Sequence, residues 1–378
     1  MHKCIVCGKD LDESTHLMLF ENMPAGAQGM PDESELENEK SMDLQLCQCP
    51  SCGLVQFDCE PVGYYKDVIR AGGYSSTMSD LRHEQYKHFI ETCNLQGRKI
   101  IEIGCGQGEF LDMLRDFPVE GYGIEHSAKL VKMALDKGLN VWEDFAESGD
   151  TKLANGPFDA FLSFNFLEHQ PDPNGMMQCI YNNLTDGGVG LVTVPNFEYI
   201  LENNAFYELL RDHIANYTAD TLTVLMNRNG FDVIEKTVVN RDTISFIVKK
   251  RTKIDISGIK SGLDTFNSHV RDYIVSRVGS GKKLAVWGAS HQSFTTLSTS
   301  GVGDKVSYII DSAPFKQGKF SPASHVPIVS PDYFHENPVD SILIIAPGYT
   351  DEIHSIIINK FGEHIEVGAI RTETIEVL

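Results

Sequence analysis

The feature that most constrains the fold is residues 99–111, where a short β-branched strand runs into a glycine-rich turn and then an amphipathic helix. Gly104, Gly106 and Gly108 lack a Cβ atom where the backbone must bend sharply and approach a ligand closely. A strand, such a turn and a helix in succession are typical of a nucleoside-binding α/β sheet. We therefore expect a nucleoside against these glycines and against Glu102, which lies at the end of the strand.

The composition excludes several classes of partner. The 378 residues include 53 acidic and 32 basic side chains, which gives a net charge of −21. Nucleic acid and anionic membranes do not attract such a chain. Its length suits two or three domains, and no apolar run approaches the roughly 18 residues of a membrane span. We expect a cytoplasmic protein, a monomer or small homo-oligomer, with no nucleic-acid or membrane partner.

Four cysteines near the N-terminus have the spacing of metal ligands. Cys4 and Cys7 form one Cys-x-x-Cys-Gly knuckle, and Cys49 and Cys52 form a second. Each knuckle offers two thiolates from one tight turn, and two knuckles complete a tetrahedral shell around zinc. Four cysteine ligands leave no open position, so this zinc would be structural. Cys47 could replace one ligand, but its spacing is poorer.

From residue 98 onward, strands and helices alternate, which is typical of a parallel sheet with crossover helices. Ligands bind such sheets beyond the carboxyl ends of the strands. We expect strands at 99–103, 119–124, 139–142, 158–164 and 189–194, and an antiparallel pair at 231–239 and 243–249.

Several strand ends carry side chains that suit a nucleoside. Glu125 ends the second strand and is placed to bind a ribose diol. After the third strand, Asp144 could meet an adenine amino group and Phe145 could stack on the ring. Asn165 follows the fourth strand and completes the predicted cofactor site.

A basic run at 249–253 begins a linker to a second α/β unit, which starts with an expected helix at 262–278. That unit has its own strand-end turns, and an anionic ligand could bind near Ala289 and Lys316. The predicted domains are 1–62, which binds zinc, 63–252, which binds the cofactor, and 253–378.

Together these motifs resemble one family, the S-adenosylmethionine-dependent sugar C-methyltransferases of deoxysugar biosynthesis. The resemblance covers the whole chain: Cys-Gly-Leu-Val-Gln at 52–56, the glycine turn, Leu-Glu-His at 167–169, and Lys-Gln-Gly-Lys-Phe at 316–320. It implies a class I methyltransferase sheet of Rossmann-like α/β type. A small zinc-binding domain would precede that sheet, and a Rossmann-like α/β domain that contributes to acceptor binding would follow it.

The resemblance also implies a nucleotide-activated keto sugar as acceptor and a His-Glu-His segment in the active site. Here only the last histidine is retained, as His213, with Arg211 and Asp212 in place of the other two residues. A carbon next to a ketone becomes nucleophilic only after it loses a proton, which suits a histidine base. We expect His213 to be that base, Asp212 to orient it or act as a second acid/base, and Tyr74 to hydrogen-bond the enolate oxygen. His169 would be structural.

Three alternatives remain open at this stage. An O- or N-methyltransferase could use His213 to deprotonate a hydroxyl group of a sugar or related metabolite. A nicotinamide-dependent dehydrogenase is disfavoured by the Gly-x-Gly-x-Gly spacing and by the Leu-Glu-His segment. A noncatalytic, zinc-scaffolded binding protein is disfavoured by the intact cofactor motifs.

Overall fold

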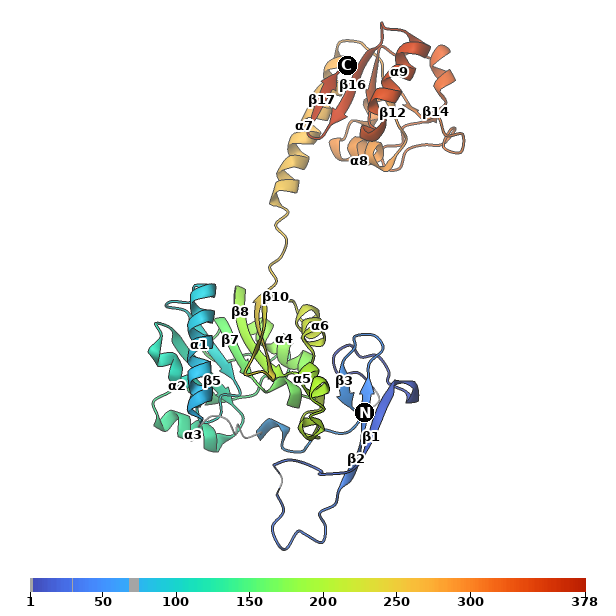
Figure 1. Ribbon diagram of the computed structural model, residues 1–378. Helices are drawn as coiled ribbons and strands as arrows, with labels where there is room; N and C mark the ends of the chain where they lie inside the picture. The colour runs from blue at the N-terminus through green and yellow to red at the C-terminus, as the bar shows by residue number, and fades with distance from the viewer. Residues whose placement is uncertain (1–2, 29, 68–74) are drawn as a thin grey trace. The chain divides into compact units, whose positions relative to one another are not determined.

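The computed structural model describes residues 3–28, 30–67 and 75–378. The chain divides into two compact units, Met1–Lys253 and Ile254–Leu378. The first contains a four-stranded and a seven-stranded sheet, and the second contains a six-stranded sheet (Figure 1). No helix in the described part of the chain is long and apolar enough to cross a membrane.

The four-stranded sheet joins the N-terminal lobe, by which we mean the described residues up to 62, to a distant segment. Its antiparallel order is β1-β2-β3-β9. The sequence did not reveal β9, because two residues carry no alternation of apolar and polar side chains. The strands are β1 (His16–Met23), β2 (Met42–Gln48), β3 (Val55–Phe57) and β9 (Ala215–Asn216).

The seven-stranded sheet has the order β10-β11-β8-β7-β4-β5-β6. The strands from β8 to β6 in this order are parallel, and β11 is antiparallel to both of its neighbours. This confirms the predicted parallel sheet with an added antiparallel pair. Its strands are β4 (Lys99–Ile103), β5 (Glu120–Glu125), β6 (Val141–Glu143), β7 (Phe158–Phe164), β8 (Leu184–Pro195), β10 (Phe231–Val239) and β11 (Thr243–Lys250).

Two predicted strand boundaries were wrong. The third strand begins at Val141 rather than at 139, because Gly138 adopts a left-handed φ of 74° and the Leu139 N–H bonds the carbonyl of Ala134. These contacts make Leu139 part of the end of the preceding helix. Strand β8 begins at 184 rather than at 189, and this added part contains Gly187 and Gly188 next to an irregularity in the pairing of β8 with β7.

Helices cover both faces of this sheet (Figure 1). On one face, the core contains side chains of α1 (Ser76–Cys93), α2 (Glu109–Met113) and α3 (Ala128–Asp136). On the other, α4 (Pro173–Asn183) and α6 (Ala219–Arg228) share a core with Cys4 and other residues of the N-terminal lobe. The lobe and the large sheet are therefore packed as one body. The short helix α5 (Phe197–Glu202) follows β8.

The second unit is the predicted further α/β domain. Its sheet has the order β14-β13-β12-β15-β16-β17, with only β17 antiparallel. Side chains of α7 (Ser257–Gly279) and α8 (His291–Ser300) share one core, and those of α9 (Thr350–Phe361) belong to the other. The strands are β12 (Leu284–Trp287), β13 (Ile309–Ile310), β14 (Ile328–Val329), β15 (Ser341–Ile344), β16 (Glu366–Arg371) and β17 (Thr374–Val377).

Candidate active site

The glycine turn after β4 has the backbone conformation for which glycine is needed. Gly104, Gly106 and Gly108 have φ values of 69°, 59° and 80°, in the left-handed region that favours glycine. Glu125, at the end of the neighbouring strand β5, accepts hydrogen bonds from the N–H groups of Gly106 and Ser127, each at 2.9 Å. The predicted ribose-binding carboxylate therefore lies against the turn.

Four of the predicted cofactor residues line one small cavity at this edge of the sheet. They come from the ends of three neighbouring strands: Gly104, Glu125, Asp144 and Phe145. The Lys66 ammonium group lies 4.6 Å from the centroid of the Phe145 ring, and the Asp144 carboxylate accepts the N–H of Phe145 at 2.8 Å. Of the other four, Gly106 and Gly108 form the turn itself, Glu102 is fully buried in β4, and Asn165 lines a neighbouring cavity.

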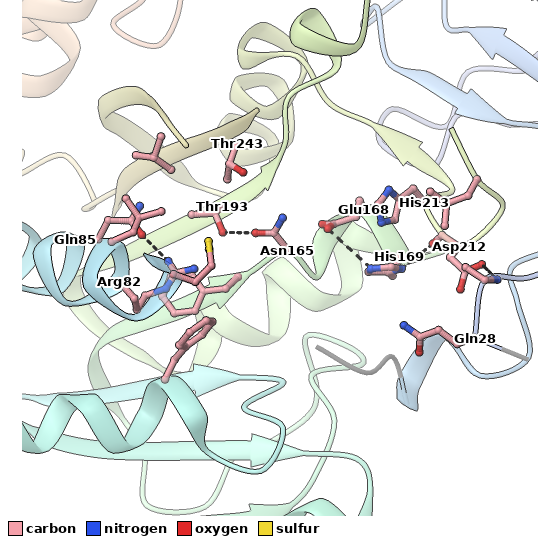
Figure 2. A pocket seen from close by; sticks show the side chains of 17 residues that line it. Gln28, Arg82, Gln85, Asn165, Glu168, His169, Thr193, Asp212, His213 and Thr243 are labelled. Atoms are coloured by element: carbon pink, nitrogen blue, oxygen red, sulfur yellow. Dashed lines mark hydrogen bonds and ion pairs between the residues drawn. The ribbon is translucent and has the colours of Figure 1, made fainter. Parts of the chain in front are cut away.

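The neighbouring cavity, of about 280 Å³, is where the predicted acid/base residues lie (Figure 2). It is lined by α1, by the ends of β7 and β8, by the segment before β9 and by the N-terminal lobe. The polar side chains around it are Gln28, Arg82, Gln85, Asn165, Glu168, His169, Thr193, Asp212, His213 and Thr243.

Two histidines and a glutamate meet in this cavity. The rings of His169 and His213 have centroids 4.8 Å apart, and His169 Nε2 lies 3.9 Å from Glu168 Oε1. Burial lowers the pKa of His213 to about 3, with a smaller contribution from the charge of His169. His213 is therefore neutral at pH 7, which is the form that a general base requires.

The carboxylate of Asp212 binds the N-terminal lobe instead of orienting the His213 ring. Its carboxylate accepts the Ala27 N–H at 2.8 Å and the Tyr64 hydroxyl at 2.9 Å. Its backbone carbonyl lies 2.8 Å from Nδ1 of His169, so this carbonyl orients the other histidine. The sequence did not reveal these contacts, since Ala27 and Tyr64 are far from Asp212 along the chain.

Arg211 reinforces the same junction. Its guanidinium group donates hydrogen bonds to the carbonyl oxygens of Ala25 at 2.9 Å and Glu60 at 3.0 Å. The two residues that replace the family's histidine and glutamate thus bind the lobe, whose Ala27 and Gln28 line the cavity. Tyr74, the expected hydrogen-bond donor, lies outside the described residues.

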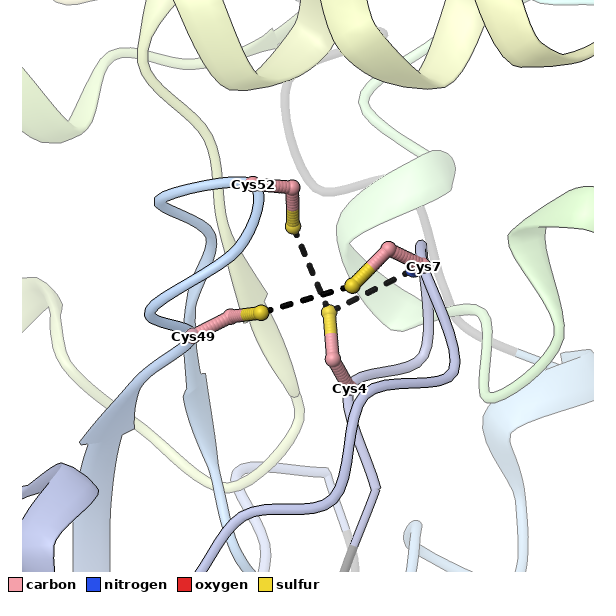
Figure 3. Close-up of side chains that lie close together, drawn as sticks. All are labelled: Cys4, Cys7, Cys49 and Cys52. Atoms are coloured by element: carbon pink, nitrogen blue, oxygen red, sulfur yellow. Dashed lines mark hydrogen bonds between the residues drawn. The ribbon is translucent and has the colours of Figure 1, made fainter.

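The four predicted cysteines form a single cluster (Figure 3). The Sγ atoms of Cys4 and Cys52 are 3.5 Å apart, and those of Cys7 and Cys49 are 3.4 Å apart. Four sulfurs at the usual zinc distance of about 2.3 Å lie about 3.8 Å from one another, so this donor set fits a four-coordinate metal. Cys47 does not belong to the cluster.

Comparisons with known proteins agree with this geometry. A methyltransferase-domain family matches residues 78–236, and the family of C-methyltransferase C-terminal domains matches residues 257–363. This chain is an S-adenosylmethionine-dependent methyltransferase of the C-methyltransferase type. The C-methyltransferase NovU of Streptomyces niveus is 22% identical over 390 residues, which cover 93% of this chain and 91% of NovU.

Other relatives match less than half of this chain. A ubiquinone biosynthesis O-methyltransferase of Cupriavidus pinatubonensis is 24% identical over 43% of this chain and 72% of its own. A solved S-adenosylmethionine-dependent methyltransferase from Clostridium acetobutylicum aligns with 46% of this chain and 92% of its own, at 13% identity and a TM-score of 0.38. The identification as a methyltransferase excludes the dehydrogenase and the noncatalytic binding protein that the sequence left open.

Proposed function

We propose that this methyltransferase transfers a methyl group to a carbon beside the ketone of a nucleotide-activated sugar, with His213 as the general base. The observation that carries the proposal is the position of His213, which lines the cavity beside the glycine turn together with Glu168 and His169. Burial lowers the pKa of His213, which favours the neutral form that a base requires. The similarity to NovU over nearly the whole chain supports transfer to carbon. The proposal that the acceptor is a nucleotide-activated sugar rests on the resemblance of the sequence motifs to the sugar C-methyltransferase family.

The predicted strand-end residues would hold S-adenosylmethionine. Glu125 would bind the ribose diol, and Asp144 and Phe145 would meet the adenine, since all three lie around one cavity. Asn165 would contact the cofactor from the larger cavity that it lines. The backbone at Gly104, Gly106 and Gly108, with Glu102 beneath it, would approach the methionine part. The cofactor supplies an electrophilic methyl group on a sulfonium.

The chemistry requires the acceptor carbon, the methyl carbon and the sulfur in line, with water excluded. His213 would remove the proton from the acceptor carbon, and Tyr74 would hydrogen-bond the oxygen on which negative charge develops. For Asp212 we propose positioning, because its carboxylate holds Ala27 and its carbonyl holds the His169 ring.

We also propose that the cysteine cluster holds a structural zinc ion. Four thiolates would saturate the metal, so it would take no part in methyl transfer. Its effect would be to hold the first knuckle, whose carbonyls at Ile5 and Val6 accept hydrogen bonds from the Asn174 amide of α4 at 2.8 and 3.0 Å. The lobe would in turn keep Gln28 at the cavity wall.

The test uses cofactor labelled with carbon-13 in its methyl group and a panel of nucleotide-linked keto sugars. The chemical shift of the product methyl group shows whether it is bonded to carbon. Transfer to oxygen or nitrogen would instead establish the alternative methyltransferase. We expect His213→Asn to reduce turnover about 100-fold or more, while binding of S-adenosylhomocysteine is retained in calorimetry. Near-normal turnover of this variant would refute the base assignment.

A further inference from the structure

We propose that Glu168 is a second catalytic residue, which as a neutral carboxylic acid donates a hydrogen bond to the acceptor's ketone oxygen while His213 removes the proton from the adjacent carbon. The inference rests on the proposed C-methylation and adds to it a residue that neither the sequence motifs nor the comparisons assign. The cavity would then contain a general acid, Glu168, beside its general base, His213.

The position of Glu168 is the first argument. One carboxylate oxygen of Glu168 and one ring nitrogen of each of His169 and His213 lie within 4.8 Å of one another. Glu168 lines the cavity, although the residue is almost fully buried at 1% exposure. It follows Phe166 and Leu167 at the carboxyl end of β7, the edge where this fold binds its ligands.

The second argument is the state of its carboxyl oxygens. Oε2 is buried and has no hydrogen-bond partner among the described residues. Oε1 lies 3.9 Å from His169 Nε2, which is beyond hydrogen-bond distance. An ionised carboxylate in such a place is costly, because neither a cation nor enough donors replace its water. The neutral acid is therefore the favoured form, with an O–H group available to a ligand.

The titratable groups facing Glu168 agree with that assignment. They are His169, His213 and Tyr217, whose hydroxyl is also buried. Burial raises the pKa of Glu168 to about 8 and lowers the pKa of both histidines. An environment that makes a carboxyl group neutral and a neighbouring imidazole neutral at the same pH creates an acid and a base side by side.

The reaction balances with these two groups. His213 takes the proton from carbon, the C–H electron pair forms the carbon–carbon double bond, and the carbonyl π pair moves to oxygen, which Glu168 stabilises by its hydrogen bond. The electron-rich carbon then attacks the methyl group, and the carbon–sulfur pair stays on sulfur. The carbonyl re-forms, Glu168 keeps its proton, and His213 releases one proton to solvent.

The first test needs no acceptor. In the complex with S-adenosylhomocysteine at neutral pH, an infrared difference between wild type and Glu168→Gln should contain the carbonyl stretch of a protonated carboxyl group. The matched control Glu198→Gln removes an exposed carboxyl from the first turn of α5 and should show no such band. Absence of the band in the Glu168→Gln difference would overturn the proposal. So would a second metal equivalent in the wild type that this variant loses, since the same three residues would then be metal ligands.

The second test uses turnover of a keto sugar. Glu168→Leu has no donor and should lower kcat about 100-fold, the usual effect of losing one oxyanion donor, with unchanged affinity for S-adenosylhomocysteine. Glu168→Gln keeps an N–H donor and should retain part of the activity. Wild-type activity should fall as pH rises through about 8, and Glu168→Gln should lack that decline. Near-normal kcat in Glu168→Leu would refute the assignment. A wild type that turns over no keto sugar would refute the proposed function instead, whatever the infrared result.

Discussion

The two large sheets of this enzyme share one local design. Each places a carboxylate at the carboxyl end of the strand that neighbours its first strand: Glu125 is the last residue of β5, and Asp311 directly follows β13. Glu125 accepts the N–H of Gly106 at 2.9 Å, and Asp311 accepts the N–H of Ala289 at 2.8 Å. Each thus bonds the turn after the adjacent strand. A carboxylate at a strand end is therefore not by itself a nucleoside site.

Two differences separate the sheets. The turn after β4 has three left-handed glycines, whereas the turn after β12 has one, Gly288. Asp311 also forms an ion pair with Lys316 at 2.9 Å, which neutralises its charge. The anion expected near Ala289 and Lys316 would have to compete with Asp311 for this lysine. Glu125, by contrast, lines a cavity together with Asp144 and Phe145. We propose that the number of left-handed turn glycines and the adjoining cavity distinguish the cofactor edge of the first sheet from the corresponding edge of the second.

Of the predicted effects, metal removal should cause the largest difference in stability between the two units. The cysteine cluster belongs to the first unit and shares a core with the large sheet. Structural zinc contributes about 10–16 kcal/mol of binding free energy to folding in zinc-finger peptides, so loss of a metal from this cluster should strongly destabilise the first unit. We expect Cys49→Ser, or a chelator, to lower the unfolding temperature of the first unit in calorimetry while the second unit's transition stays in place.

The matched control is Cys93→Ser, which changes a half-buried cysteine of α1 outside the cluster. It should leave the metal content at the wild-type value. Equal destabilisation of both units by Cys49→Ser would show that the unit with the cysteine cluster and the C-terminal unit do not differ in the way we describe.

The two carboxylates should differ in their effect on cofactor affinity. Glu125→Ala removes the predicted ribose ligand, and a lost charged hydrogen-bonding partner costs about 2 kcal/mol, or roughly 30-fold in Kd. Asp311→Ala should leave the Kd for S-adenosylhomocysteine unchanged in calorimetry and lower only the stability of the second unit. If both variants bind S-adenosylhomocysteine equally well, the assignment of the ribose to Glu125 fails.

The sequence predicted elements that carry a strong local signal. Strands β4 and β7 and the hairpin of β10 and β11 were found within a residue, because β-branched and aromatic runs are bounded there by turn residues. The glycine turn and the cysteine cluster were found for a similar reason, since their chemistry depends on close spacing along the chain.

What the sequence did not reveal depends on contacts between distant segments. The hydrogen bonds of Arg211 and Asp212 to the lobe became visible only in the structure, because their partners Ala25, Ala27 and Glu60 precede them by most of the first unit. Glu168 was visible as part of a motif. Its burial without a partner for Oε2 is a property of the packed cavity and leaves no pattern in the sequence.

The smallest effect should come from the turn glycines. Alanine in the left-handed region costs about 1 kcal/mol, and a Cβ at Gly106, where φ is 59°, would lie 3.0 Å from the Glu109 carboxylate. Gly106→Ala should therefore weaken binding of S-adenosylhomocysteine about fivefold. Gly288 has a φ of 110°, and its Cβ would lie 3.1 Å from the carbonyl oxygen of Ile345. We expect Gly288→Ala to lower the unfolding temperature of the second unit and to leave that binding unchanged. If Gly288→Ala weakened binding as much as Gly106→Ala, the turn of the second sheet would belong to the cofactor site, and counting left-handed glycines would not distinguish the two edges.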